Sequence, residues 1–177
     1  MAVLDIIYYG NPILNKKCKN VVEFNKLNII IDTMFDTMYE EEGIGLAANQ
    51  VGVDMNLFII DITHTEEVDD TYVFINSEII SFEGEKNIFQ EGCLSLPGIA
   101  IEVSRPETVI LKYQTLDEKW HQCKFTGLMS RAIQHEMDHL NGVFIVDRVS
   151  TSERIKYQNQ LKLLEDNSIR QMEMASK

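Results

Sequence analysis

The segment His135-Glu136-Met137-Asp138-His139 constrains this chain more than any other part, because it has the form H-E-x-x-H. Residues four apart lie on one face of an α-helix, one turn from each other, so two imidazoles at this spacing can reach one cation. The glutamate between them then lies beside the ion without binding it, as a base for a water molecule on the metal must. The alternative, a polar helix face with two ordinary histidines, is a poor one in a chain with only four histidines. The segment therefore predicts a helix that carries two metal ligands and a general base.

Three helices are predicted from apolar residues at helical spacing and from the signals at their ends. The helix that carries the motif should run from about Gly127 to Leu140, with Thr126 as its N-cap and Asn141-Gly142 as its stop. An earlier helix is predicted from about Asn25 to Glu42. An amphipathic helix from about Ser152 to Leu164 closes the chain.

Short runs of β-branched and aromatic residues predict the strands. Leu57–Ile60 and Tyr72–Ile75 are two such runs. Thr108–Thr115 and Trp120–Phe125 are predicted as the arms of a hairpin that turns at Asp117-Glu118. Neighbouring strands around one central helix indicate an α+β fold rather than a βαβ alternation. We expect mixed or antiparallel β-sheets packed around the metal-binding helix, with an N-terminal and a C-terminal helix.

Length and composition indicate one catalytic domain over residues 1–177, in which about 151–177 form the C-terminal helix and tail. No apolar run approaches the roughly 18 residues that span a bilayer, and the N-terminus lacks the features of a signal peptide. Three cysteines are too few for a disulfide framework and favour a reduced, cytoplasmic chain. The net charge of −12 argues against nucleic-acid binding. The acidic stretch His64–Asp70 is predicted to be a solvated loop.

A catalytic metal site needs a third protein ligand and one open position. The extended metalloprotease pattern would place a glycine three residues after His139 and a histidine three further on, but Gly142 is followed by Ile145 at the last position. The third ligand must therefore come from elsewhere in the chain. Cys93, in the segment Gln90–Pro97, is the best candidate, because a cysteine at a strand end can point its sulfur at a neighbouring helix. Alone, Cys93 fits a buried structural thiol better; its pairing with H-E-x-x-H reverses that interpretation.

Three segments together resemble the signature motifs of the peptide deformylase family. They are Gly43-Ile44-Gly45-Leu46-Ala47-Ala48-Asn49-Gln50, Glu91-Gly92-Cys93-Leu94-Ser95 and Gln134–His139, and they occur in the family's order. The similarity extends from about Tyr8 to Val149. Three matching motifs are far more specific than any one of them.

The resemblance implies a role for each matching residue. Cys93, His135 and His139 would bind one divalent metal ion, commonly Fe²⁺ in the cell, with Zn²⁺, Ni²⁺ or Co²⁺ able to replace it. Glu136 would be the general base and then the general acid for a metal-bound water or hydroxide. The remaining roles fall to oxyanion donors and a substrate track: Gln50 and the backbone N–H of Leu94 for the first, and Ile44, Gly45 and Gly92 for the second.

The resemblance also implies the reaction, which is removal of the formyl group from the formyl-methionine of newly synthesised polypeptides, with formate released. This is N-terminal methionine processing in protein biosynthesis. Leu128 and Ala132 fall in one stripe with the two histidines and could form an apolar wall suited to a methionine side chain, or could be ordinary core residues. Arg131 precedes that stripe where an apolar residue is also possible. In some relatives the C-terminal helix contacts the ribosome near the exit tunnel, a contact left unassigned here.

Two other functions compete with the deformylase. An H-E-x-x-H endopeptidase would take its third ligand downstream of the helix, from Asp147, Glu153 or Glu165. A structural zinc module would close the site with a fourth ligand such as His121 or Cys123, which alternate along a predicted strand and could also form a second metal site. Glu136 and Gln50 argue against a structural module, because a purely structural site needs neither residue.

Overall fold

A computed structural model of the chain describes residues 3–176. In chain order, with η for a 3-10 helix, the elements are η1 (Pro12–Asn15), α1 (Leu27–Glu40), β1 (Gly45–Ala47), η2 (Ala48–Val51), β2 (Leu57–Ile60), β3 (Tyr72–Gly92), β4 (Ala100–Gln114), β5 (Trp120–Phe125), α2 (Gly127–Leu140), η3 (Ile145–Asp147), α3 (Thr151–Ile155) and α4 (Gln158–Ala175). Met1, Ala2 and Lys177, which the predicted domain includes, lie outside the described residues.

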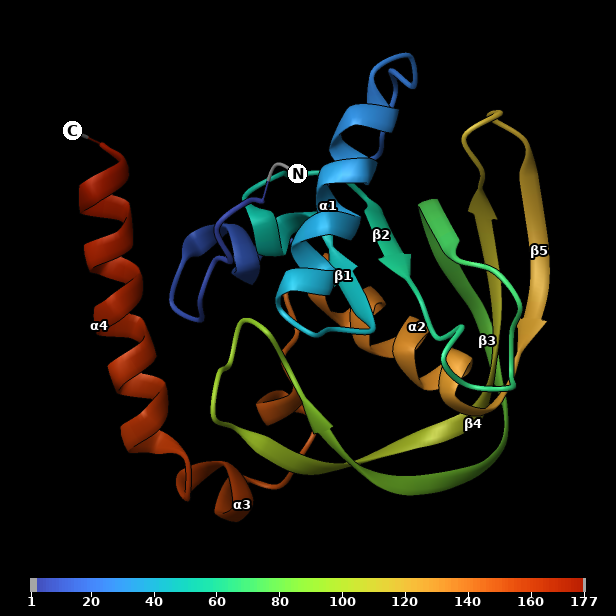
Figure 1. Ribbon diagram of the computed structural model, residues 1–177. Helices are drawn as coiled ribbons and strands as arrows, with labels where there is room; N and C mark the ends of the chain where they lie inside the picture. The colour runs from blue at the N-terminus through green and yellow to red at the C-terminus, as the bar shows by residue number, and fades with distance from the viewer. Residues whose placement is uncertain (1–2, 177) are drawn as a thin grey trace.

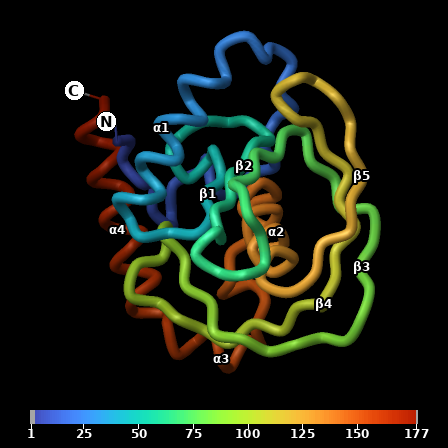
Figure 2. Tube along the Cα trace, turned by 45° about the vertical axis from the view of Figure 1, so that its right-hand side comes forward, coloured from blue at the N-terminus to red at the C-terminus, as the bar shows by residue number. Residues whose placement is uncertain are grey.

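The five strands form one antiparallel sheet in the order β1-β2-β3-β4-β5. This sheet is strongly curved and wraps around α2, which lies in the middle of the molecule (Figures 1 and 2). β1 and β2 lie on one side of α2, while β3, β4 and β5 pass beside and beneath it (Figure 2). The predicted α+β fold, with a central helix and further helices near both ends of the chain, is confirmed.

β2 lies between two helices and is buried on both of its faces. Phe58 and Ile60 belong to the core cluster that contains α2, whereas Leu57 and Ile59 belong to the cluster that contains α1. All four side chains are fully buried. A continuous apolar run of this kind is what a strand covered on both faces requires. β2 therefore fixes the position of α2 relative to α1 and to the segment that follows α1.

α2 has the bounds that its sequence predicts, and its apolar residues explain its place. Met129, Ile133, Met137 and Leu140 recur at helical spacing and are buried in the core cluster under the sheet. The helix ends at Leu140, and Gly142 follows two residues later with a positive φ of 73°, which suits glycine. A Cβ at position 142 would lie 2.7 Å from the carbonyl carbon of Asn15. The opposite side of α2 is left free to carry polar residues.

β3 and β4 extend much further than the sequence predicts, and β1 was not predicted at all. β3 continues from Ile75 to Gly92, and β4 begins at Ala100 instead of Thr108. The added part of β3 is mostly exposed, so the alternation of buried and exposed residues that marks a strand is missing there. Backbone pairing holds the two strands together instead. We call their paired ends, Lys86–Gly92 and Ala100–Pro106, the β3–β4 ribbon.

The C-terminal region forms two helices rather than the single helix predicted from Ser152 to Leu164. α3 ends at Ile155, and α4 then runs on to Ala175. The second half of α4 is polar, but it is held through side chains that bond to the N-terminal segment: Ser168 Oγ donates to the carbonyl of Tyr8 and Gln171 Nε2 to that of Ile6. Such contacts leave no apolar period in the sequence. Within residues 3–176, no helix is long and apolar enough to cross a bilayer.

The N-terminus of α2 is capped by a residue that the sequence analysis placed in a solvated loop. Thr126 occupies the N-cap position, but its side chain makes no capping hydrogen bond. The Glu67 carboxylate accepts instead from the backbone N–H groups of Leu128 and Met129, both at 3.3 Å. A carboxylate at this end of a helix satisfies free N–H groups and complements the helix dipole. The stretch His64–Asp70 is a mostly exposed loop, as predicted, and Glu67 within it also caps α2.

We expect Glu67→Ala to lower the free energy of unfolding by about 1 kcal/mol, the usual cost of a lost helix cap. Glu66→Ala is the matched control, because Glu66 is a neighbouring exposed carboxylate and makes no such contact. Urea unfolding of the two variants and the wild type measures the difference. Equal unfolding midpoints for the two variants would show that the Glu67 contacts do not stabilise α2.

Candidate active site

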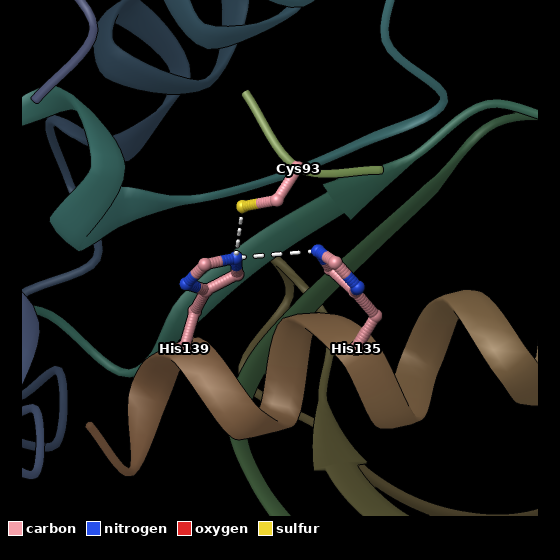
Figure 3. Close-up of side chains that lie close together, drawn as sticks. All are labelled: Cys93, His135 and His139. Atoms are coloured by element: carbon pink, nitrogen blue, oxygen red, sulfur yellow. Dashed lines mark hydrogen bonds between the residues drawn. The ribbon is translucent and has the colours of Figure 1, made fainter. Parts of the chain in front are cut away.

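Three potential metal ligands meet beside α2. His135 and His139 rise one turn apart from α2, and Cys93 points down to them from the chain just after β3 (Figure 3). His139 Nε2 lies 3.1 Å from Cys93 Sγ and 3.3 Å from His135 Nε2. All three donor atoms lie within 4.8 Å of one another. The structure thus brings together the cysteine and the two histidines that the sequence indicates.

The donor set fits a single divalent cation. In a tetrahedral site with metal–nitrogen bonds of roughly 2.0–2.1 Å, two nitrogens lie roughly 3.3 Å apart, which is the separation of the two imidazole nitrogens. His135 Nδ1 lies 3.1 Å from Glu91 Oε2, a contact that directs Nε2 toward the other donors. Burial lowers the pKa of His139 well below its ordinary value and so favours the neutral imidazole that metals bind.

Glu136 is buried beside this cluster and is close to Gly45. Only 4 % of Glu136 is exposed, and burial raises the pKa of its carboxyl to about 7. Glu136 Oε2 has no hydrogen-bond partner among residues 3–176. A Cβ at position 45 would lie only 2.6 Å from Glu136 Oε1, so β1 needs glycine here to admit the carboxylate. The glycine at position 45 and the attachment of Glu136 to α2 together determine where the Glu136 carboxyl lies.

Gln50 is held next to the thiol by its own backbone turn. It lies in η2, directly after β1, and is almost fully buried. Gln50 Oε1 accepts from the N–H of Ala47 at 2.9 Å, which directs the amide nitrogen outward. Gln50 Nε2 then lies 3.2 Å from Ser95 Oγ and 3.8 Å from Cys93 Sγ. The amide thus presents N–H groups at the edge of the cluster.

A cavity of about 600 Å³ opens onto these residues. Each predicted oxyanion, track and wall residue contributes to its lining, namely Gln50, Leu94, Ile44, Gly45, Gly92, Leu128 and Ala132. Cys93, His135 and Glu136 also line it. Ala132 also belongs to the core cluster under the sheet and Leu128 packs against that cluster, so both residues have core contacts as well as a place in the cavity lining.

A buried network of charges surrounds the ligands, and the sequence analysis missed it. Arg105, only 4 % exposed, donates from Nε and Nη2 to Glu91 at 2.7 and 3.0 Å and from Nη1 to Asp138 at 2.9 Å. Arg131 Nη1 donates to Glu91 Oε1 at 2.6 Å, and Arg148 Nε to Asp138 at 3.1 Å. Burial alone would raise the pKa of Glu91, but the hydrogen bonds from its neighbours outweigh it and lower the pKa to about 2. The carboxylate that orients one ligand is thereby kept ionised.

We expect Glu91→Gln to lower the free energy of unfolding by about 3–5 kcal/mol, because it leaves buried guanidinium groups without their counter-charge. Metal affinity should fall by about 10–100-fold, the usual cost of losing the partner of a ligating histidine. The matched control is Glu102→Gln, since Glu102 lies on the facing strand of the ribbon but is exposed. Denaturant unfolding and competition with a chelator measure both effects. Equal values for the two variants would contradict the role of the network.

The residues required by the competing functions are not at this site. Cys93, His135 and His139 form the single group of His, Cys, Asp or Glu residues within 3–176 that could hold an ion. His121 contacts the Thr115 hydroxyl, and Cys123 accepts from the Tyr113 hydroxyl. Neither a downstream third ligand nor a fourth ligand therefore joins the cluster, and a second metal site at His121 and Cys123 is not found among the described residues.

Comparison with known proteins identifies the family. The family model of polypeptide deformylase matches residues 3–155. The chain belongs to the peptide deformylase family. It is 44% identical over 155 residues to the peptide deformylase of Acidobacterium capsulatum, covering 87% of this chain and 91% of that one. Identity to the Chromobacterium violaceum peptide deformylase is also 44%, over 170 residues, with 96% and 100% covered.

Solved structures of peptide deformylases share this fold. The crystal structure of the Thermus thermophilus enzyme superposes with a TM-score of 0.86 at 34% identity, covering 93% of this chain and 99% of that chain. The protein is therefore an enzyme of the deformylase family with a group of ligands suited to a metal.

Proposed function

We propose that this deformylase removes the formyl group from the formyl-methionine at the start of newly synthesised polypeptides and releases formate. The observation that carries the proposal is the meeting of Cys93 Sγ and the two histidine Nε2 atoms beside the buried Glu136 carboxyl. The family to which the chain belongs supports the same reaction. Three ligands from the protein leave one position of a tetrahedral site for water or substrate, as hydrolysis requires.

Cys93, His135 and His139 would hold the cation, and Fe²⁺ is the ion we propose in the cell. A divalent cation, when bound, polarises the formyl carbonyl and lowers the pKa of water so that hydrolysis proceeds near neutral pH. Fe²⁺ forms weaker complexes than Zn²⁺, Ni²⁺ or Co²⁺, so the purified enzyme would exchange its metal readily. The Glu91 contact keeps the His135 ring in the orientation that the ion needs.

Glu136 would move the proton during the reaction. It would accept a proton from the attacking water and later deliver one to the nitrogen of the departing methionine. A carboxyl with a pKa near 7 can do both at neutral pH, because neither protonation state is strongly favoured. Its freedom from other hydrogen bonds at Oε2 leaves that oxygen available for water.

Gly45→Ala is expected to lower kcat by roughly 100-fold, because the added Cβ would lie 2.6 Å from Glu136 Oε1 and displace the carboxyl. The substitution touches none of the three ligands, so metal content should stay at the wild-type value. Formate release, metal analysis and the unfolding midpoint are measured together. A wild-type kcat in the folded variant would contradict the proposal that the reaction depends on the present position of the Glu136 carboxyl.

The Gln50 amide and the backbone N–H of Leu94 would stabilise the negative oxygen of the tetrahedral intermediate. Gln50 is oriented by Ala47 before any substrate arrives, which is the property that makes such donors effective. Leu94 directly follows Cys93, so its N–H and the thiolate are presented by one turn of the chain. Loss of one such donor typically costs roughly 10²–10³ in rate.

The substrate peptide would lie extended between two strand edges. β1 is at the edge of the sheet, and in the described part of the chain β2 pairs with β3 only at Tyr72–Ile75, which leaves one side of the ribbon's end unpaired. Ile44, Gly45 and Gly92 line the cavity between these edges. An extended chain adds to such edges through backbone hydrogen bonds. The methionine side chain would then point to Leu128 and Ala132.

We also propose the setting in which the enzyme works. A single domain acting in the cytoplasm on nascent chains fits three unpaired cysteines and the absence of a membrane-spanning helix within residues 3–176. The net charge of −12 argues against direct contact with nucleic acid. Association of α4 with the ribosome is left unassigned, because that helix carries side chains of both charge signs.

Formate release from formyl-Met-Ala-Ser by protein purified without air tests the proposed function. The metal is determined in the same sample. Acetyl-Met-Ala-Ser is the control substrate, because the added methyl group replaces the formyl hydrogen. We expect formate from the first peptide, little product from the second, and no cleavage of internal peptide bonds. Internal cleavage without formate would favour the endopeptidase instead.

A further inference from the structure

Arg131 spans the space between α2 and the β3–β4 ribbon at one wall of the cavity. It lies one turn before His135 and lines the cavity. Its guanidinium ends on the ribbon: Nη1 donates to Glu91 Oε1 at 2.6 Å and to the carbonyl of Val103 at 3.0 Å, and Nη2 donates to the carbonyl of Asn87 at 2.7 Å. The side chain is therefore fixed at both of its ends.

These contacts make Arg131 a rigid part of the wall. Its side chain is only 14% exposed, and its guanidinium carbon lies 5.0 Å from the centre of the Phe89 ring. A planar guanidinium with three hydrogen bonds and a ring beside it has little freedom to move. Leu128, Arg131 and Ala132 lie on one face of the helix, so the apolar stem of Arg131 completes the wall next to the small Ala132 side chain.

We propose that Arg131 is a specificity-determining residue that limits the length of the side chain accepted next to the formyl group. This inference rests on the proposed function. A mobile wall would yield to a longer side chain, but Arg131 can move only by breaking its hydrogen bonds to Glu91, Val103 and Asn87. Methionine has four heavy atoms beyond Cα, and side chains that reach further would meet the fixed stem. Removal of Arg131 would open the wall toward the ribbon.

The test compares formyl-X-Ala-Ser peptides in which X is norleucine or 2-aminooctanoic acid, whose side chain is longer by two methylenes. For the wild type we expect kcat/KM to fall at least tenfold from the shorter to the longer side chain. In Arg131→Ala, the ratio of kcat/KM for the 2-aminooctanoic acid peptide to kcat/KM for the norleucine peptide should rise by tenfold or more. The reason is that each newly buried methylene contributes about fourfold in binding. Arg170→Ala removes an exposed arginine of α4 and should leave the ratio unchanged.

The ratio distinguishes a change in selectivity from a general loss of activity, because a disturbed metal site or a less stable fold lowers kcat/KM for both peptides together. Arg131→Met keeps an unbranched stem without the guanidinium and carries the test if Arg131→Ala does not fold. An unchanged ratio in whichever variant folds would overturn the inference. Formate release from formyl-Met-Ala-Ser by the wild type tests the proposed function separately, so the two failures are distinguishable.

Discussion

Glu136→Gln is expected to lower kcat for formate release by about 10²–10⁴-fold, the usual contribution of a general acid–base group. The amide has nearly the same shape as the carboxylate but cannot accept a proton. Because Glu136 is buried and lies beside the ligands without being one of them, the fold, the metal content and the binding of peptide should change little. The loss should therefore appear in kcat and leave KM near the wild-type value.

The measurement is a formate assay at saturating formyl-Met-Ala-Ser with metal analysis of each sample. Glu173→Gln is the matched control, because Glu173 is an exposed carboxylate on α4, far along the chain from the cavity residues. That variant should keep wild-type kcat. Undiminished formate release by Glu136→Gln at full metal content would refute the proposed proton transfer.

Cys93→Ala is expected to remove most of the bound metal and with it the activity. Cys93 is one of the three donors that residues 3–176 bring to the site, and as a thiolate it would supply the negative charge that offsets a bound cation. Losing it should weaken metal binding by well over the 100-fold that a lost supporting residue costs. Metal analysis after dialysis and formate release measure the two losses. Added metal should restore activity only in part.

Cys123→Ala is the matched control for Cys93→Ala, because Cys123 is also a half-buried free thiol but lies on β5, away from the cavity. It should keep its metal and its activity. Unchanged metal occupancy in Cys93→Ala would mean that the third ligand lies elsewhere, as in the competing endopeptidase. The pair of variants therefore distinguishes loss of a ligand from loss of a thiol.

The elements that the sequence predicted well are those with a strong apolar period or a clear end signal. α2 combines buried residues at helical spacing with a stop at Gly142, and its bounds were predicted to the residue. β2 was predicted because all four of its residues are apolar. Most of β3 was missed because its side chains face solvent on both sides. In that part, backbone pairing and the curvature of the sheet determine the structure, and neither leaves a period in the sequence.

The meeting of the three potential metal ligands was predictable because each belongs to a local motif, whereas the charged groups that contact them were not. Glu91 belongs to one of the three motifs, but the sequence analysis assigned it no role. Its role depends on contacts with Arg105 of the next strand and with His135 of a later helix. One signal was present in β4. Ile101, Val103 and Arg105 alternate on the face that is buried, so an arginine in that register predicts buried carboxylates nearby.

The origin of the three donors in distant parts of the chain has a consequence for the amount of folded enzyme. Cys93 follows β3 and both histidines lie on α2, so the unfolded chain has no preformed site and a bound cation would favour the native state. Mass action then ties conformational stability to free metal: above the dissociation constant, each tenfold rise adds about 1.4 kcal/mol. Metal starvation would accordingly deplete the native population and expose it to proteolysis, in addition to emptying the catalytic centre.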